Sequence, residues 1–236
     1  MLYAIVEGVK ESASPTSKGQ CPFCESEMVP KCGDFKSWHW AHKRVVSCDA
    51  WYKPETEWHR RWKNVFGIKN CEVILIRAGQ KHIADIQTIH GRIIELQNSP
   101  INLETIESRE KFYGSNMIWI INGIHFIENF ITYPTQGTEF DTYTPEFEKF
   151  AKMHGFTPKY RMLGEENRER FKWKRPKQVW GHAKAQVYID FGNEFLFFII
   201  QGLGTSNGTG ANISKKQFII EHGGDESLVS TVINIK

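Results

Sequence analysis

Carboxylates inside apolar segments are the first feature of this sequence that could carry out chemistry. Asp85 lies in "IADIQ" and Glu95 in "IIELQ", where most neighbours are apolar. An ionised carboxylate in a buried strand is costly unless it is paired or bound to a metal ion. If the two segments form a hairpin, Asp85 and Glu95 can meet on one face, because side chains alternate along a strand. Two converging carboxylates are a usual way to hold Mg²⁺ or Mn²⁺.

A divalent ion held there could act on phosphate esters. It would polarise a phosphodiester, lower the pKa of a bound water and offset negative charge in the transition state. Glu55 could supply a third carboxylate from a helix, and Gln97 could orient the attacking water or a phosphate oxygen. The pattern alone equally allows Asp85 and Glu95 to be exposed residues of an amphipathic hairpin.

The elements that would position these residues read as an α/β unit. We expect a helix at 54–66, because a proline followed by acids suits a helix start. A second helix is expected from Asn102, as the N-cap, to Gly114, where it would stop. The expected strands lie at 72–78, 82–89, 92–97 and 116–123. This order predicts an α/β fold in which a helical crossover joins the last strand.

Beyond about residue 135 the pattern is weaker. We expect a helix at 144–155 and a hairpin at 185–201 that turns at Gly192–Asn193. A flexible loop is expected at 201–214 and a strand at 217–223. Three domains are therefore expected. The first, at 1–52, is an N-terminal strand with a zinc-binding segment. The second, at 53–135, is the α/β core, and the third, at 136–236, is a β-rich C-terminal extension.

Cysteine and histidine spacing predicts a zinc site near the N-terminus. Four of the five cysteines lie in the first fifth of the chain, which in a reducing compartment suggests a metal rather than disulfides. "CPFC" supplies Cys21 and Cys24, and "HWAH" supplies His39 and His42. The second ligand pair is His39 with His42, or His42 with Cys48, since tetrahedral Zn²⁺ takes four such ligands. We expect a structural zinc, because protein ligands would fill every position.

The cysteines allow two other interpretations. Cys32 and Cys48 could be buried small apolar residues, with the histidines capping loops. A redox C-x-x-C motif is the other alternative, but no thioredoxin-like pattern surrounds it.

The acids and the order of the elements resemble the PD-(D/E)XK nuclease superfamily. The motif here is D-(x)9-E-x-Q, with Gln97 where that superfamily has its lysine. Residues 21–123 more specifically resemble the CoiA-like competence proteins, through "CPFC", "HWAH", "PETEWH", "IADIQ", "IIELQNSPI", "SREKFY" and "IWIING". The resemblance implies a PD-(D/E)XK-like core at 53–135 that hydrolyses DNA in processing or recombination, with Mg²⁺ or Mn²⁺ as cofactor. RNA is not excluded as a substrate.

The resemblance also implies roles for single residues. Glu55 matches the helix acid of the family's pattern, although Thr56 stands where serine is usual, and His59 matches its histidine. Asp85 and Glu95 match the metal-binding acids.

The residue in the lysine position raises a chemical question. Gln97 cannot supply the charge of a lysine. Lys63, two turns beyond Glu55, could substitute from the helix, or it could be a solvated surface lysine. A catalytically inactive nuclease-fold protein that binds nucleic acid as a recombination accessory factor is therefore the alternative function.

Polar and basic residues after the acids could contact nucleic acid. Asn98 and Ser99 could hydrogen-bond phosphate or shape a turn, and Arg109 could contact phosphate or pack against an acid. A basic segment interleaved with Phe171 and Trp173 could neutralise phosphates and stack on bases, or form a strand with a solvated charged edge. Its basic residues are Arg168, Arg170, Lys172, Lys174, Arg175 and Lys177.

Composition adds only broad bounds. The 236 residues are 40% hydrophobic and 24% charged, which is ordinary for a folded protein, and the net charge of +3 says little about partners. The N-terminus does not read as a signal peptide, and no run approaches the roughly 18 apolar residues that span a bilayer. We therefore expect a cytoplasmic protein without a membrane partner.

Overall fold

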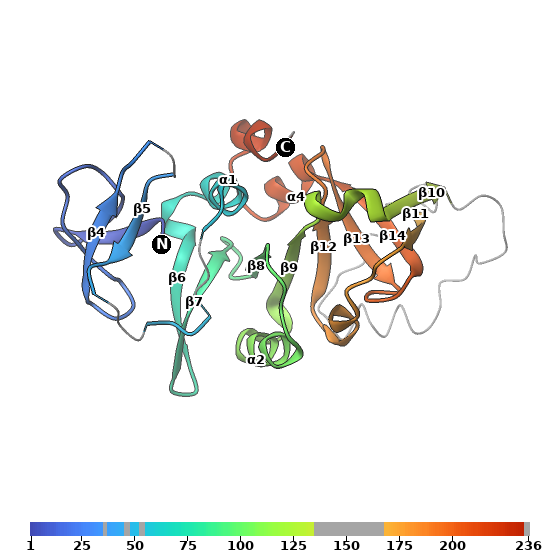
Figure 1. Cartoon of the computed structure of the whole chain (residues 1–236), viewed down its shortest axis with the longest axis horizontal. Helices are drawn as coiled ribbons and strands as arrows, with labels where there is room; N and C mark the ends of the chain where they lie inside the picture. Colours follow the sequence, from blue (N-terminus) through green and yellow to red (C-terminus); the bar gives the residue numbers. More distant parts are fainter. Residues whose placement is uncertain (35–36, 45–47, 52–54, 135–167, 234–236) are drawn as a thin grey trace. The chain divides into compact units, whose positions relative to one another are not determined.

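The computed structural model describes residues 1–34, 37–44, 48–51, 55–134 and 168–233 (Figure 1). Contacts divide the chain into two compact units. Unit 1 comprises Met1–Ile94 and Ile219–Val232, and unit 2 comprises Glu95–Phe218 and Ile233–Lys236. The predicted boundaries at 52/53 and 135/136 stay predictions, and the contact-based division falls elsewhere, within the strand that carries Ile94 and Glu95.

Unit 1 begins with an antiparallel sheet in the order β2-β1-β3-β4-β5. Its strands are β1 (Tyr3–Val6), β2 (Val9–Ser12), β3 (Gly19–Gln20), β4 (Glu27–Lys31) and β5 (His39–His42). Ala4, Met28 and Trp40 form its core together with Cys21. A Cβ at Gly19 would lie 2.8 Å from the Cβ of Ala4, so the close approach of these strands requires a glycine.

Helix α1 (Glu57–Phe66) follows, and the residues on either side of it set its two ends. Thr56 is the N-cap and forms a capping box with His59, and the helix ends at Gly67, whose φ is 75°. Trp58 and Trp62 are buried, as expected for the apolar stripe of an amphipathic helix. The predicted helix is therefore confirmed, with its first turn starting three residues later than expected. A short turn, η1 (Ile68–Asn70), leads into the next strand.

The three strands predicted at 72–78, 82–89 and 92–97 are also present. Strands β6 (Cys71–Arg77) and β7 (Gln80–Gln87) pair antiparallel. Strand β8 (Ile93–Gln97) pairs antiparallel with β7, through Ile86 with Ile94. The turn η7 (Glu226–Val232) from the end of the chain packs on α1, and the amide of Asp225 donates to the carbonyl of Val65 at 2.8 Å.

Unit 2 is built on strands in the order β8-β9-β12-β13-β14-β11-β10, starting with the Glu95–Gln97 part of β8. Strand β9 is parallel to β12, and the strands from β12 to β10 pair antiparallel. Helix α2 (Leu103–Tyr113) has the predicted N-cap Asn102 and ends at Gly114. The remaining strands are β9 (Met117–Asn122), β10 (Phe130–Pro134), β11 (Arg168–Trp173), β12 (Gln186–Asp190), β13 (Phe195–Gln201) and β14 (Asn207–Ser214). Short turns η2 (Gly114–Asn116), η3 (Ile124–Asn129) and η6 (Gln178–His182) connect them.

Two predictions beyond residue 185 are wrong. The expected flexible loop contains strand β14, because its glycines serve packing: a Cβ at Gly208 would lie 2.5 Å from the ring of Phe171. The expected strand at 217–223 lies in helix α4 (Lys215–Glu221), because the periodicity of a short apolar run does not separate helix from strand. The hairpin of β12 and β13 is confirmed, and the helix predicted at 144–155 lies outside the described residues.

The structure thus confirms a mixed α/β protein with β-rich sheets. Its PD-(D/E)XK-like core stays a prediction. No helix in the described part of the chain is long and apolar enough to cross a membrane.

Candidate metal centre and acidic cluster

Four side chains of unit 1 converge as a metal site would require. One ligand atom each from Cys21, Cys24, His42 and Cys48 lies within 4.8 Å of all the others. The sulfurs of Cys21 and Cys48 are 3.8 Å apart, and the sulfur of Cys24 is 3.3 Å from Nε2 of His42. Two sulfurs bound tetrahedrally at about 2.3 Å from Zn²⁺ would be about 3.8 Å apart. The three cysteines and one histidine therefore fit a zinc ion.

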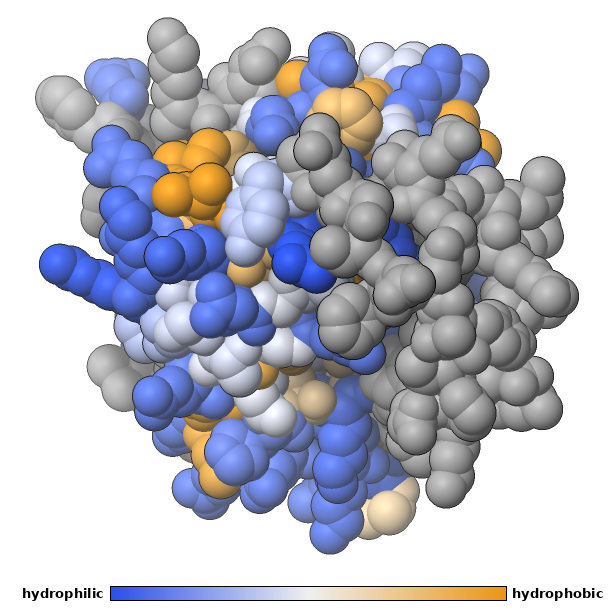
Figure 2. All heavy atoms as spheres, turned by 90° about the vertical axis from the view of Figure 1, so that its right-hand side faces the viewer, coloured by the Kyte–Doolittle hydropathy of each residue, from blue (hydrophilic) through white to orange (hydrophobic). Residues whose placement is uncertain are grey.

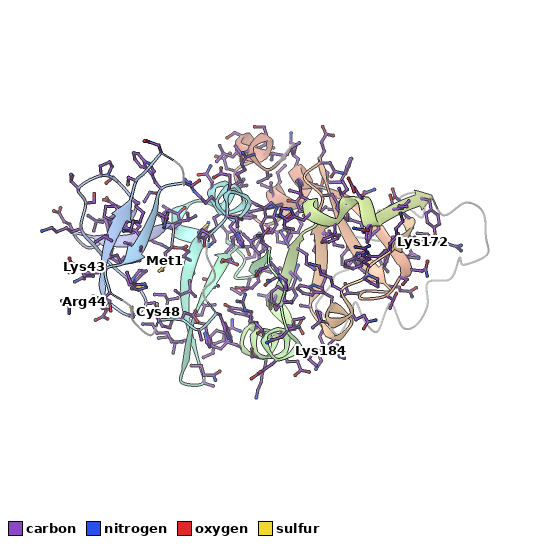
Figure 3. The ribbon with its side chains drawn as sticks, in the orientation of Figure 1. Met1, Lys43, Arg44, Cys48, Lys172 and Lys184 are labelled. Atoms are coloured by element: carbon purple, nitrogen blue, oxygen red, sulfur yellow. The ribbon has the colours of Figure 1, made fainter. Side chains whose placement is uncertain are left out.

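Local backbone structure brings these four ligands together. Cys21 and Cys24 flank a turn after β3, in which the amide of Glu25 donates to the carbonyl of Cys21 at 2.8 Å. His42 is the last residue of β5, and Cys48, labelled in Figure 3, follows that strand. His39 lies outside the group, with Nδ1 2.9 Å from the carbonyl oxygen of Ser37. The structure therefore selects the ligand scheme that pairs His42 with Cys48.

The thiols of the cluster differ in acidity. Burial raises the pKa of Cys48 to about 12 and also raises that of Cys21. Burial acts the same way on Cys24, but hydrogen bonds from the hydroxyl and amide of Ser26 outweigh it and lower the pKa of Cys24 to about 6. Zinc binds thiolates, so binding would displace protons from Cys21 and Cys48.

Asp49 connects the metal-binding segment to strand β7. This residue follows Cys48 directly and is buried. Its carboxylate accepts a hydrogen bond from the amide of Ile83 at 2.7 Å and lies 2.9 Å from Nδ1 of His82. The ring of His82 stacks on Trp51.

A second polar centre of unit 1 surrounds Lys63. The ammonium lies 2.5 Å from Glu55, 2.9 Å from Asp85 and 3.4 Å from Glu72, measured to one carboxylate oxygen of each. The Lys63 side chain is 1% exposed, whereas Asp85 is 21% exposed. The interpretation of Lys63 as a solvated surface lysine is therefore wrong. We call these four residues the Lys63 cluster.

Glu72 is the member of this cluster that sequence reasoning missed. It lies in β6 with a φ of 47°, and its two carboxylate oxygens accept the amides of Leu2 at 2.9 Å and Tyr3 at 3.2 Å. The signal that singled out Asp85 was available here too, because Glu72 begins the apolar segment "EVILI". A charged residue at the start of an apolar segment is usually the solvent-exposed end of a strand, so the position of Glu72 did not indicate burial.

The charges of the Lys63 cluster do not balance. Three carboxylates face one ammonium, and burial raises the pKa of Glu55 to about 7 although Lys63 opposes this. Burial opposes ionisation of Glu72, but Lys63 and the backbone amides outweigh it and lower the pKa of Glu72. Burial would lower the pKa of Lys63, but the carboxylates, with Asp85 first, raise it well above its usual value. The excess negative charge can be offset by a proton or a further cation.

His59 serves the start of α1. Its backbone amide and ring both contact Thr56, and Nδ1 lies 2.7 Å from the Thr56 hydroxyl. Within the described residues, the Cys/His group is the sole set of three or more close metal-binding side chains. The acids of the Lys63 cluster share an ammonium instead.

The other predicted acid belongs to unit 2. Glu95 is 2% exposed, and one of its oxygens lies 2.5 Å from Nη1 of Arg109 on α2. The guanidinium of Arg109 also lies 5.9 Å from the centre of the Trp119 ring. The sequence allowed Arg109 either to contact phosphate or to pack against an acid. In the structure it packs against the acid Glu95.

The residues after Glu95 are held by amide hydrogen bonds. Gln97 is 6% exposed and donates from Nε2 to the carbonyl of Ser99 at 2.6 Å. Asn98 accepts a hydrogen bond from Nδ2 of Asn122 at 2.7 Å. The loop of Asn98 and Ser99 therefore forms the turn that one interpretation of the sequence favoured, and it also lines a cavity with Gln97 and Asn122.

The basic segment is only partly what the sequence indicated. Phe171 and Trp173 are buried, at 0% and 1% exposure, so stacking of these rings on bases is excluded. Strand β11 pairs with β10 and β14, so it is not an edge strand. Lys172, labelled in Figure 3, is exposed, as are Lys174 and Arg175, whereas Arg168 and Arg170 are half-buried. The coloured atoms on this side of the molecule are mostly hydrophilic (Figure 2).

The fold and the two centres define a mixed α/β protein with a Cys₃His group that could hold a metal ion such as zinc. Residues 10–50 match the family model described as the N-terminal domain of the competence protein CoiA. That match includes all four residues of the metal group and supports the resemblance to CoiA-like proteins. No curated protein and no solved structure matches the chain.

Proposed function

We propose that this protein is a divalent-metal-dependent nuclease that hydrolyses phosphodiester bonds of DNA in a competence-related process. The observation that carries this proposal is the Lys63 cluster, in which Glu55 and Asp85 meet at one ammonium. The residues that the resemblance to CoiA-like proteins assigns as helix acid and metal-binding acid are thereby brought together, Glu55 from just before the N-cap of α1 and Asp85 from β7. The family match of residues 10–50 supports the competence-related role.

The donors of the Lys63 cluster suit a hard divalent cation. Mg²⁺ and Mn²⁺ prefer carboxylate oxygens, and three carboxylates with one ammonium leave negative charge to offset. Asp85 is the most exposed of the three acids and so the one that a cation can reach from solvent. We propose Asp85 as a metal-binding acid of this cluster; the resemblance assigns a metal-binding role to Glu95 as well, which lies in unit 2 and pairs with Arg109. The bound ion would polarise the phosphodiester and lower the pKa of the attacking water.

Lys63 offers an answer to the missing lysine of the motif. Gln97 carries no charge, whereas the Lys63 ammonium lies 2.9 Å from Asp85 and keeps its proton because the carboxylates raise its pKa. A fixed cation beside the metal-binding acid would stabilise negative charge that develops on the phosphoryl oxygens. We therefore assign Lys63 the electrostatic role that a lysine at position 97 would have had.

A specific observation favours a second candidate function. The Lys63 ammonium already pairs with Glu55 and Asp85, so a metal ion must compete with an internal cation for the same oxygens. If the internal cation prevails, the fold serves as a nucleic-acid-binding accessory factor in recombination and does not cleave.

Metal-dependent cleavage separates the two functions. The full chain, loaded with zinc, is incubated with single-stranded, duplex and branched DNA and with RNA, with Mn²⁺ or with no added divalent ion. We expect Mn²⁺-dependent cleavage of DNA that Asp85→Asn and Glu95→Gln abolish without loss of DNA binding. Glu27→Gln, which alters an exposed ion pair with Lys43, is the control and should cleave normally. Binding without cleavage under every condition would establish the accessory factor instead.

A further inference from the structure

A cavity of about 300 Å³ lies within unit 2, where β8 and β9 end and η6 begins. This volume is at the small end of ligand-binding pockets, so it suits one small unit and not a double helix. Three side-chain amides, a lysine and a tryptophan contribute to its lining, namely Gln97, Asn98, Asn122, Lys177 and Trp180.

Hydrogen bonds fix the amides at the cavity. Asn122 donates from Nδ2 to Oδ1 of Asn98 at 2.7 Å, and its own Oδ1 accepts from the amide of Ile124 at 3.0 Å. Gln97 uses Nε2 for the carbonyl of Ser99 at 2.6 Å. Among the described residues, Nδ2 of Asn98 and Oε1 of Gln97 have no hydrogen-bond partner. The cavity thus offers an amide donor and an amide acceptor in set orientations.

The remaining lining adds charge and a rigid wall. Lys177 is exposed, and its ammonium lies 5.4 Å from the centre of the Phe126 ring. Trp180 is 2% exposed and packs edge to face against Trp119, with ring centres 5.3 Å apart. An amide donor and acceptor can read the hydrogen-bonding edge of a base, and a lysine neutralises phosphate, whereas Trp180 is buried and keeps the wall behind them rigid.

We propose that this cavity binds a single unpaired nucleotide of single-stranded DNA, with Gln97 and Asn98 at the base edge and Lys177 at a phosphate. A base paired in a duplex hides that edge, so the site selects single strands or unpaired ends. The inference deepens the proposed function and rests on it only in taking nucleic acid as the ligand. It names the strand form that the protein recognises.

Binding of a fluorescently labelled single-stranded oligonucleotide by the full, zinc-loaded chain tests this site. The titration is done without Mg²⁺ or Mn²⁺, so that it does not depend on cleavage. Asn98→Ala and Lys177→Met should each weaken binding about tenfold, and Lys177→Met should also reduce the salt dependence by about one phosphate contact. Lys184→Met, on an exposed lysine that does not line the cavity and is labelled in Figure 3, should bind as the unchanged protein does.

Two further measurements keep the result free of folding effects. Asn98→Asp keeps the oxygen that accepts from Asn122 but removes the donor Nδ2, so it should lose affinity with an unchanged melting temperature. Nucleoside monophosphates should compete with the oligonucleotide, whereas deoxyribose 5-phosphate, which has no base, should not.

Several outcomes would overturn this site. They are Asn98 and Lys177 variants that bind like Lys184→Met, equal competition by the baseless sugar phosphate, or equal affinity for blunt duplex DNA. Failure of the nuclease proposal looks different, because the unchanged protein would then cleave nothing with Mn²⁺ while the Asn98 variants still lost binding.

Discussion

The Cys/His group and the Lys63 cluster are two polar centres in one unit, and they solve the problem of buried charge differently. The Cys/His group gathers four soft ligands at distances that suit one zinc ion and contains no cation of its own among its members. The Lys63 cluster gathers three carboxylates around an ammonium that the chain itself supplies. The first centre could therefore be held together by an external ion, whereas ion pairs within the chain hold the second together.

Removal of a zinc ligand should give the largest effect. Cys21→Ser should lose the bound zinc and much of the stability of the N-terminal sheet, because the binding free energy of a structural zinc is folding free energy. Zinc content by mass spectrometry of the native protein and thermal unfolding measure this. Cys32→Ser is the matched control, since Cys32 packs nearby but lies outside the group. Retention of zinc by Cys21→Ser would show that the group is not its site.

Removal of the internal cation should come next in size. Lys63→Met leaves three carboxylates with little to balance them, and loss of one partner from a buried pair costs about 3–5 kcal/mol. Urea unfolding measures the change. The exposed Lys43→Met, which breaks a surface pair with Glu27, should cost about 0–1 kcal/mol. Equal stabilities of the two variants would mean that the Lys63 cluster is open to water.

Close packing beside the metal group sets a smaller effect. Gly19→Ala places a methyl group 2.8 Å from the Cβ of Ala4 and should destabilise the protein by about 1–3 kcal/mol. Gly33→Ala meets nothing within 4 Å and should be close to neutral. The comparison is made on zinc-loaded protein by thermal unfolding. If Gly19→Ala were also neutral, the sheet would owe its order to zinc alone.

The pH dependence of stability should give the subtlest effect. Burial raises the pKa of Glu55 to about 7 in the folded protein, so the folded state holds this proton to higher pH than the unfolded state does. Stability from this group should therefore fall as pH rises from about 4.5 to about 7, and then stay level. The difference between the unchanged protein and Glu55→Gln isolates it, with the exposed Glu57→Gln as control. A difference that is flat with pH would refute the assignment.

Local signals in the sequence carried most of the fold of residues 55–123. The N-cap Asn102 and the stop Gly114 mark α2 through backbone chemistry that acts within a few residues. The predicted start of α1 lies three residues too early, because it rests on the proline and the acids and not on the capping box of Thr56 with His59. The candidate zinc ligands could also be predicted from the sequence, because metal geometry restricts their residue types and spacing. The choice between His39 and Cys48 was not, because it depends on how β5 and the following segment lie in three dimensions.

What the sequence could not show depends on contacts between distant residues. Glu72 is recruited to Lys63 and to the amides of Leu2 and Tyr3, about seventy positions away. The glycines of β14 look like a loop until the rings of Phe171 and Phe197 occupy the space that side chains would need. Likewise, the aromatics of the basic segment could face solvent or core, and only the neighbouring strands decide that they are buried.

The hydrogen bonds of Asp49 connect the segment that would bind zinc to strand β7 of the neighbouring hairpin. One end of this link is a ligand, Cys48, and the other is the backbone at Ile83, two residues before Asp85. A chelator that removes zinc from Cys48 without contacting any carboxylate would weaken this connection and make strand β7, which carries Asp85, less ordered. Loss of activity after zinc depletion would then report a displaced acid and not a missing catalytic ion.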